Sequence, residues 1–94
     1  METDYQALVI SVFGDVQRVG YRNWTRREAN ARGLRGWVRN RRNTVQVAVW
    51  GPPEPLAAFL LACVSGPRRS AVTRVSFRST SNPPPSGFRI RKTV

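Results

Sequence analysis

The sequence contains no histidine, a single cysteine and only five acidic residues. Without histidine a Ser-His-Asp triad is impossible, and a zinc site is not expected. The acidic residues are scattered along the chain with no paired spacing that would suggest a two-carboxylate acid–base site; they are Glu2, Asp4, Asp15, Glu28 and Glu54. An enzyme built from this chain must therefore rely mainly on the positioning of its substrate and on positive charge.

Long hydrophobic runs are absent as well. The longest apolar stretch, residues 56–64, is far shorter than the roughly 18 residues that span a membrane. The acidic residues 1–4 do not resemble a secretion signal. The lone Cys63 cannot form an internal disulfide, which fits a reducing compartment, and its place on an apolar helical stripe predicts an inert core thiol. We expect a cytoplasmic monomer with no membrane partner, no metal and no cofactor.

Positive charge, by contrast, is abundant. Sixteen basic residues, of which all but Lys92 are arginine, give a formal net charge of +11. Such a surface attracts phosphates, nucleic acids or acidic lipids, and charge alone does not choose among them. The planar guanidinium favours recognition of oxyanions. A chain of 94 residues suits one domain, so we expect a single domain over residues 1–94, with residues 1–6 as a flexible N-terminal extension.

The hydrophobic pattern predicts an α+β fold. The apolar, β-branched segment 7–13 predicts a strand that is buried on both faces or nearly so. Further strands are predicted at residues 34–40, 44–50, 72–79 and 88–91, with helices at residues 21–32 and between Pro52 and Gly66. The order βαββαβ, with a short fifth strand at the C-terminus, is that of a ferredoxin-like sandwich, in which an antiparallel sheet carries both helices on one face.

The loop between the first strand and the first helix, residues 14–22, is the first candidate site. At a helix N-terminus the backbone N–H groups are free and the helix dipole favours an anion. Arg22 lies in the first helical turn, where its guanidinium fork could bind two phosphate oxygens. The pattern also allows an ordinary β–α connection with a solvated arginine.

Asn40, at the end of the second strand, is the second candidate. A neutral amide can hold a water molecule by donating and accepting hydrogen bonds together. Asparagine before a hairpin turn is, however, common turn chemistry. In this fold the first and third strands form the central pair, and the second strand lies beside the third. Arg22 and Asn40 could therefore converge.

These two segments together resemble the acylphosphatase family. Residues 14–22 read G-D-V-Q-R-V-G-Y-R and residues 36–40 read G-W-V-R-N. The corresponding family patterns are G-x-V-Q-G-V-x-[FY]-R and G-[FW]-V-x-N. The resemblance extends from about residue 8 to residue 90.

The resemblance implies a metal-free hydrolase that cleaves acyl phosphates into carboxylate and inorganic phosphate. It also implies that the motif arginine, here Arg22, binds the phosphate, and that the motif asparagine, here Asn40, orients the attacking water. Backbone N–H groups of the loop are expected to hold the phosphate, with inorganic phosphate or sulfate as competing anions; the loop residues are Asp15, Val16, Gln17, Arg18, Val19, Gly20 and Tyr21. We expect the side chain of Asp15 to point to solvent.

The sequence departs from the family pattern at two places. Arg18 stands where the family has glycine, and if this position requires a positive φ, arginine costs about 1 kcal/mol there. The hairpin turn at residues 41–43 is one residue shorter than usual, which could shift Asn40. Two other functions stay open: an RNA-binding module of the same element order, and an acylphosphatase-like domain without activity. Nucleic-acid binding is the less favoured principal function, because residues 35–38 only faintly match the RNA-binding motif.

Overall fold

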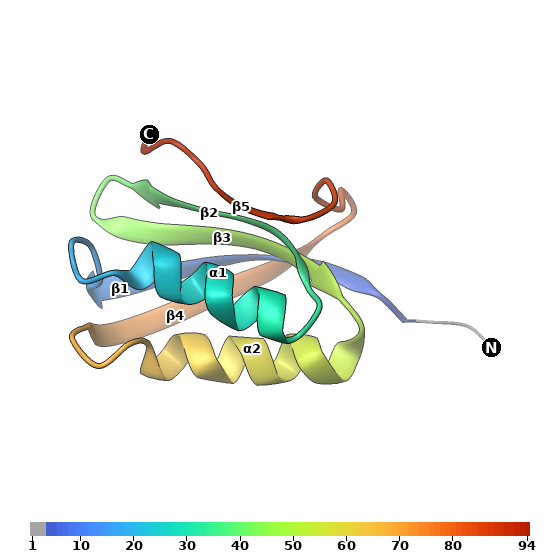
Figure 1. The fold of residues 1–94 in the computed structure, drawn as a ribbon, viewed down its shortest axis with the longest axis horizontal. Coiled ribbons are helices and arrows are strands. Elements are labelled where there is room, and N and C mark those ends of the chain that lie inside the picture. Colours follow the sequence, from blue (N-terminus) through green and yellow to red (C-terminus); the bar gives the residue numbers. More distant parts are fainter. Residues whose placement is uncertain (1–3) are drawn as a thin grey trace.

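A computed structural model describes residues 4–94. Its elements confirm the predicted order, with bounds that differ from the predicted ones by a residue or two. They are β1 (Gln6–Asp15), α1 (Tyr21–Ala31), β2 (Arg35–Arg41), β3 (Thr44–Gly51), α2 (Pro53–Ser65), β4 (Ala71–Thr80) and β5 (Phe88–Ile90) (Figure 1).

The five strands form one sheet in the order β4-β1-β3-β2-β5, so β1 and β3 are the central pair, as predicted. β1 is antiparallel to β3 and β4, and β3 is antiparallel to β2. β5, however, runs parallel to β2. Because strand direction alternates from β4 to β2, β4 ends at the same end of the sheet where β2 begins. A short link along this end of the sheet leads to β5, which therefore starts beside the start of β2 and runs in the same direction. The ferredoxin-like fold is confirmed, but its sheet is mixed rather than wholly antiparallel.

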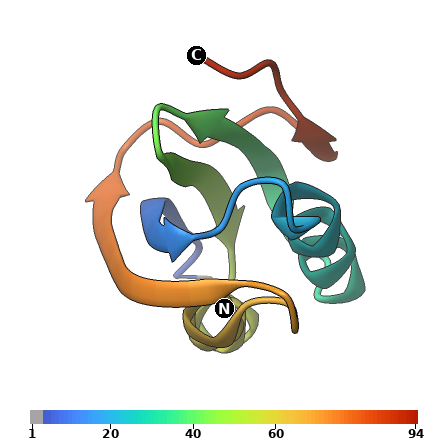
Figure 2. The same cartoon turned by 90° about the vertical axis from the view of Figure 1, so that its left-hand side faces the viewer.

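Both helices cover the same face of the sheet, as predicted (Figures 1 and 2). α1 packs over β2 and β5, and α2 packs over β4, β3 and β1. The core between these layers contains Leu8, Ile10 and Val12 of β1 and Val45, Val47 and Val49 of β3. The other side of the sheet, the open face, carries no helix. Alternate β1 residues such as Val9 and Phe13 are therefore half-buried there, so β1 is fully buried only on its helix side, whereas the sequence predicted burial on both faces or nearly so.

The two helices are joined by a buried hydrogen bond. The Tyr21 hydroxyl donates to the backbone carbonyl oxygen of Cys63 at 2.7 Å. Burial raises the pKa of the Cys63 thiol to about 12 and also raises the pKa of Tyr21. Cys63 is free and fully buried, in keeping with the inert core thiol expected from the sequence.

The predicted N-terminal extension, residues 1–6, lies partly outside the described residues, which begin at Asp4. Gln6 already belongs to β1. The ring of Tyr5 makes an edge contact with Trp50, with 4.5 Å between the ring centroids. Within residues 4–94, no helix is long and apolar enough to cross a membrane.

Candidate active site

A small pocket of about 80 Å³ opens where the loop after β1 enters α1, at the end of the molecule that faces the viewer in Figure 2. The pocket brings together Arg22 from the first turn of α1 and Asn40 from β2. The complete lining is Val16, Arg18, Gly20, Tyr21, Arg22, Asn23 and Asn40. The two candidate residues that lie 18 positions apart in the sequence therefore share one small pocket.

The start of α1 leaves its backbone donors free for a ligand. Gly20 occupies the N-cap position with φ of 79°, and no side chain of residues 4–94 caps the helix. The first helical hydrogen bond runs from the Trp24 N–H to the Gly20 carbonyl oxygen at 3.0 Å. The earlier N–H groups have no helical acceptor, and the first turn carries no acidic side chain. The dipole of the helix and the Arg22 guanidinium then both favour an anion at this position.

Asn40 lines the pocket and carries an unpaired acceptor atom. The residue lies on the helix-facing side of β2 and is only 9% exposed. Its Oδ1 atom is buried, and none of residues 4–94 donates a hydrogen bond to it. An unpaired buried acceptor costs about 1–3 kcal/mol, so this atom is suited to a water molecule or a ligand inside the pocket.

The strand that carries Asn40 is held tightly to its neighbour. Asn40 is paired with Val45 of β3, and its carbonyl oxygen accepts a hydrogen bond from the Val94 N–H at 3.1 Å. At Gly36 a Cβ atom would collide with the backbone carbonyl of Ala48. Glycine at this position thus allows β2 to approach β3 closely, and the pairing fixes the direction in which Asn40 points.

Gln17 connects the loop to the hairpin turn between β2 and β3. Its Nε2 donates to the carbonyl oxygens of Arg42 at 2.6 Å and Thr44 at 2.9 Å. The loop and the end of β2 are therefore held in a fixed relation, which sets the position of Arg22 relative to Asn40. The Gln17 side chain itself does not line the pocket.

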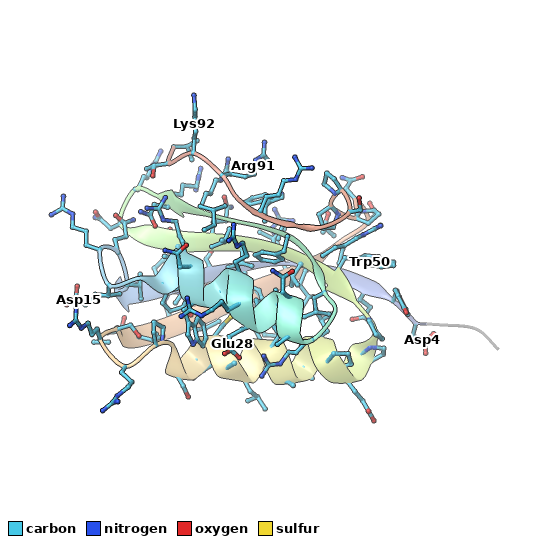
Figure 3. The ribbon with its side chains drawn as sticks, viewed as in Figure 1. Asp4, Asp15, Glu28, Trp50, Arg91 and Lys92 are labelled. Atoms are coloured by element: carbon cyan, nitrogen blue, oxygen red, sulfur yellow. The ribbon has the colours of Figure 1, made fainter. Side chains whose placement is uncertain are left out.

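The remaining loop residues occupy different surroundings. Asp15, Gln17 and Val19 are not part of the pocket lining. Asp15 is exposed at one end of the molecule, where it lines a separate hollow together with Gln17 (Figure 3). Asn23 does line the pocket, although it was not among the residues predicted from the sequence. Its position directly after Arg22 in the first helical turn is the signal that could have indicated it.

The two departures from the family pattern both involve backbone in the left-handed region. Arg18 has φ of 64° and Arg42 has φ of 56°. The position of Arg18 does adopt the conformation for which glycine is suited, and the side chain adds a positive charge to the rim of the pocket. Arg42 and Asn43 form a two-residue turn, and the short turn leaves Asn40 facing the pocket.

Among the described residues, no group of three or more His, Cys, Asp or Glu side chains could hold a metal ion.

Comparisons with known proteins identify close similarities over nearly the whole chain. Residues 8–90 match the family model Acylphosphatase. An acylphosphatase from Azorhizobium caulinodans is 47% identical over 89 residues, which cover 93% of this chain and 96% of the relative. The crystal structure of an acylphosphatase from Bacillus subtilis aligns with a TM-score of 0.85 at 34% identity, covering 90% of this chain and 97% of that one. An acylphosphatase structure from Coxiella burnetii aligns with a TM-score of 0.88 at 27% identity, covering 93% of each chain.

Proposed function

This chain belongs to the acylphosphatase family and hydrolyses acyl phosphates, and we propose that the reaction takes place in the pocket shared by Arg22 and Asn40. The observation that carries the proposal is the buried, unpaired Oδ1 of Asn40 in the same pocket as the uncapped N-terminus of α1. An anion site and a water site then lie next to each other. This activity excludes the inactive domain that the sequence left open, and it leaves RNA binding, the other alternative, as at most an additional role.

The phosphate group of the substrate binds at the start of α1. The free N–H groups of the first turn donate to its oxygens, and the Arg22 guanidinium makes two parallel, charge-assisted hydrogen bonds. Arg18 adds positive charge at the rim. In phosphoryl transfer, charge spreads over the three equatorial oxygens in the transition state. Donors fixed by the fold stabilise that charge without reorganising.

Asn40 orients the water that attacks phosphorus. Its Oδ1 accepts a hydrogen bond from the water, which directs a lone pair of the water oxygen toward the phosphate. A new P–O bond forms to this oxygen, and the bond from phosphorus to the acyl oxygen breaks. The carboxylate leaves with the electron pair, and the proton of the water passes to an oxygen of the phosphate. The products are a carboxylate and inorganic phosphate.

The chemistry of the leaving group explains why so few titratable residues suffice. A carboxylate is stable as an anion, so it needs little help from a general acid. The substrate's own phosphate can take the proton of the water. A pocket without histidine that supplies position and positive charge can therefore catalyse the reaction without a metal.

Two substitutions separate the proposed roles. Arg22→Lys keeps the charge but loses the bidentate fork, so we expect kcat/KM for acetyl phosphate, measured with a chelator present, to fall about 100-fold or more. Asn40→Ala should lower kcat by about 100-fold, because the water is no longer oriented, while the inhibition constant of phosphate stays unchanged. Arg26→Lys and Asn30→Ala, on the exposed side of α1, are the matched controls. Wild-type activity for Arg22→Lys, or an equal loss of phosphate affinity in Asn40→Ala, would contradict the assignment.

We further propose that the enzyme acts as a cytoplasmic monomer on a small-molecule acyl phosphate. The pocket is lined by residues of one chain, and the thiol of Cys63 is free, which suits a reducing compartment. Light scattering coupled to size exclusion tests the oligomeric state, and a dimer at assay concentrations would contradict this part of the proposal.

A further inference from the structure

The open face of the sheet carries an unusual density of arginine. These arginines come from the two edge strands, β4 and β5, and from β2, which are far apart in the sequence. We call this set the arginine platform; it consists of Arg35, Arg39 and Arg41 of β2, Arg74 and Arg78 of β4, Arg89 of β5, and Arg91 directly after β5.

Strand register places these side chains on one face. Residues directly opposite each other on neighbouring strands point to the same side of a sheet. Because Leu8, Ile10 and Val12 point to the helices, Val9 and Phe13 point to the open face. Their partners on β4, Arg78 and Arg74, do the same.

The arginines of β2 and β5, at the other edge of the sheet, also point to the open face. On β2, the buried residues Val38 and Asn40 face the helices, so the residues between and beside them face away. Arg39 confirms this orientation, since its Nε donates to Gln46 Oε1 of β3 at 2.9 Å. Arg89 is paired with Trp37 on the open face.

Three aromatic rings lie beneath these arginines. The guanidinium carbon of Arg35 is 4.0 Å from the ring centroid of Trp50, and that of Arg74 is 4.0 Å from the ring centroid of Phe13. Two guanidinium groups lie over Trp37, Arg39 at 4.8 Å and Arg91 at 5.1 Å. Contacts of this kind hold flexible arginine side chains against the sheet, so planar cationic and aromatic groups lie next to each other across the face.

Within residues 4–94, no acidic side chain forms an ion pair with an arginine of the platform. In residues 4–94 the one ion pair is Arg32 with Glu28, and it lies on α1. Asp4 and Asp15 lie at opposite ends of the molecule (Figure 3), and Glu54 lies in the first turn of α2. The arginine platform therefore faces solvent as a strongly positive patch, which concentrates polyanions.

Two hollows on this face could receive planar groups. One, of about 620 Å³, is lined by Trp37, Arg39, Arg89 and Arg91 together with the loop before β5 and the residues after it. The other, of about 410 Å³, is lined by Ser11, Arg39, Gln46 and Arg78 among others. Arg39 borders both hollows, so the two lie next to each other on the open face.

We propose that the arginine platform binds single-stranded nucleic acid, with the phosphates on guanidinium groups and the bases stacked on the rings and guanidinium planes. Arginine forks match phosphate oxygens, and exposed bases stack on aromatic and guanidinium surfaces in a way that tolerates sequence differences. Five strands spaced about 4.8 Å apart give a platform about 19 Å wide, which suits a short stretch of nucleotides. From the sequence alone nucleic-acid binding was the less favoured principal function; the gathering of arginines on one face supports it as a function in addition to hydrolysis.

The proposed platform and the hydrolase pocket are separate. Asn40 points to the helix side of β2, whereas its neighbours Arg39 and Arg41 point to the open face. A bound strand should therefore leave the hydrolase pocket accessible, and binding and hydrolysis should be independent.

The first test compares two triple variants that remove the same charge. Binding of a fluorescein-labelled oligothymidylate of about 12 nucleotides is measured by anisotropy. We expect Arg39→Gln/Arg74→Gln/Arg78→Gln to weaken binding at least about tenfold and to reduce the slope of log K against log salt by about 2. Arg26→Gln/Arg27→Gln/Arg69→Gln, on exposed sites away from the open face, should weaken it less than about threefold. Equal losses in the two variants, whose folding is checked by thermal unfolding, would overturn the proposal.

The second test separates nucleic acid from other polyanions. Trp37→Leu should weaken oligothymidylate binding by about tenfold through lost stacking, whereas Trp24→Leu, on α1, should not. Inorganic polyphosphate has no bases, so its binding should be weaker and insensitive to Trp37→Leu. Equally tight binding of polyphosphate would overturn the assignment to nucleic acid. So would a platform variant that loses affinity for phosphatidylserine vesicles but keeps its affinity for the oligonucleotide.

The third test uses the hydrolase activity as an independent readout. A saturating concentration of oligothymidylate should leave kcat/KM for acetyl phosphate unchanged, and phosphate should not displace the oligonucleotide at matched ionic strength. Competitive inhibition would locate the strand in the hydrolase pocket and overturn the proposal, while the hydrolase assignment itself would stand.

Discussion

Replacing Arg18 by glycine should make the protein more stable and its phosphate binding weaker. Arg18 has φ of 64°, and a left-handed conformation costs a residue with a Cβ about 1–2 kcal/mol. Glycine removes this strain but loses about 0.5–1 kcal/mol more conformational entropy on folding. The Arg18 side chain is exposed and loses little packing. The net gain is about 0.5–1 kcal/mol, which raises the melting temperature by about 2–8 °C in a domain of this size.

Arg42→Gly is the matched control for this experiment. Arg42 also has a left-handed backbone, with φ of 56°, and its removal changes the net charge equally. It lies in the hairpin turn and does not line the pocket. Both glycine variants should melt at higher temperature than the wild type. Only Arg18→Gly should raise KM for acetyl phosphate, and this difference should shrink at high salt because the exposed charge is screened.

The melting temperatures of the two glycine variants test whether backbone strain at Arg18 lowers stability. If Arg18→Gly melts at or below the wild-type temperature while Arg42→Gly melts above it, strain at position 18 is not what limits stability. Arg18→Lys keeps both the charge and the strained backbone, so it should resemble the wild type in melting temperature and in KM. A high KM for Arg18→Lys would mean that the guanidinium itself, and not only the charge, contacts the substrate.

Three further predictions concern the loop, the anion site and the core. Gln17→Ala should destabilise the fold by about 0.5–1.5 kcal/mol and raise KM, because the carbonyl oxygens of Arg42 and Thr44 lose their donor. Chemical denaturation tests this against Gln6→Ala, and equal stability of the two variants would contradict it. Inorganic phosphate or sulfate should raise the melting temperature in proportion to the logarithm of its concentration above Kd, and a similar rise in Arg22→Lys would argue against the proposed anion site. The Cys63 thiol should react with Ellman's reagent only after unfolding, since it is buried and its pKa is raised to about 12. The unfolded thiol ionises near pH 9, whereas the folded thiol stays neutral up to about pH 12. The contribution of the neutral thiol to the free energy of unfolding should therefore be complete below pH 9 and fall as pH rises toward 12. Thermal unfolding that shows the same alkaline loss of stability in Cys63→Ala would exclude the thiol as its cause.

The order of the elements could be predicted because local patterns determine it. Alternating apolar residues at 44–50, glycine and proline at the ends of helices, and short links between elements are all visible in the sequence. The direction of β5 could not be predicted in the same way, since it depends on which end of the sheet β4 reaches. The prediction that residues 7–13 are buried on both faces or nearly so did not distinguish the two faces, because an apolar strand does not reveal that one face of the sheet lacks a helix layer.

The candidate site shows the same division. The spacing of Arg22 and Asn40 suggested that they converge, and both line one pocket. The unpaired Oδ1 of Asn40 and the hydrogen bonds of Gln17 depend on contacts between elements. Because the family has glycine at the position of Arg18, the sequence raised the possibility of a positive φ there. The φ angle itself follows only from the folded loop. The arginine platform could not be predicted, because the side of the sheet to which each arginine points depends on the register of all five strands.

The close approach of β2 to β3 at Gly36 limits which substitutions and insertions this hairpin can accept. Neighbouring residues of β2 serve opposite sides of the sheet, Asn40 in the pocket and Arg39 and Arg41 on the platform. A slip of one residue along β3 would exchange the two sides, turning an arginine into the pocket and the amide out to solvent. Any side chain at Gly36 collides with the Ala48 carbonyl and would force such a shift or separate the strands. An insertion in the short hairpin turn would shift the same register of β2 on β3. The length of the turn and the glycine at position 36 are therefore both needed to keep Asn40 in the pocket.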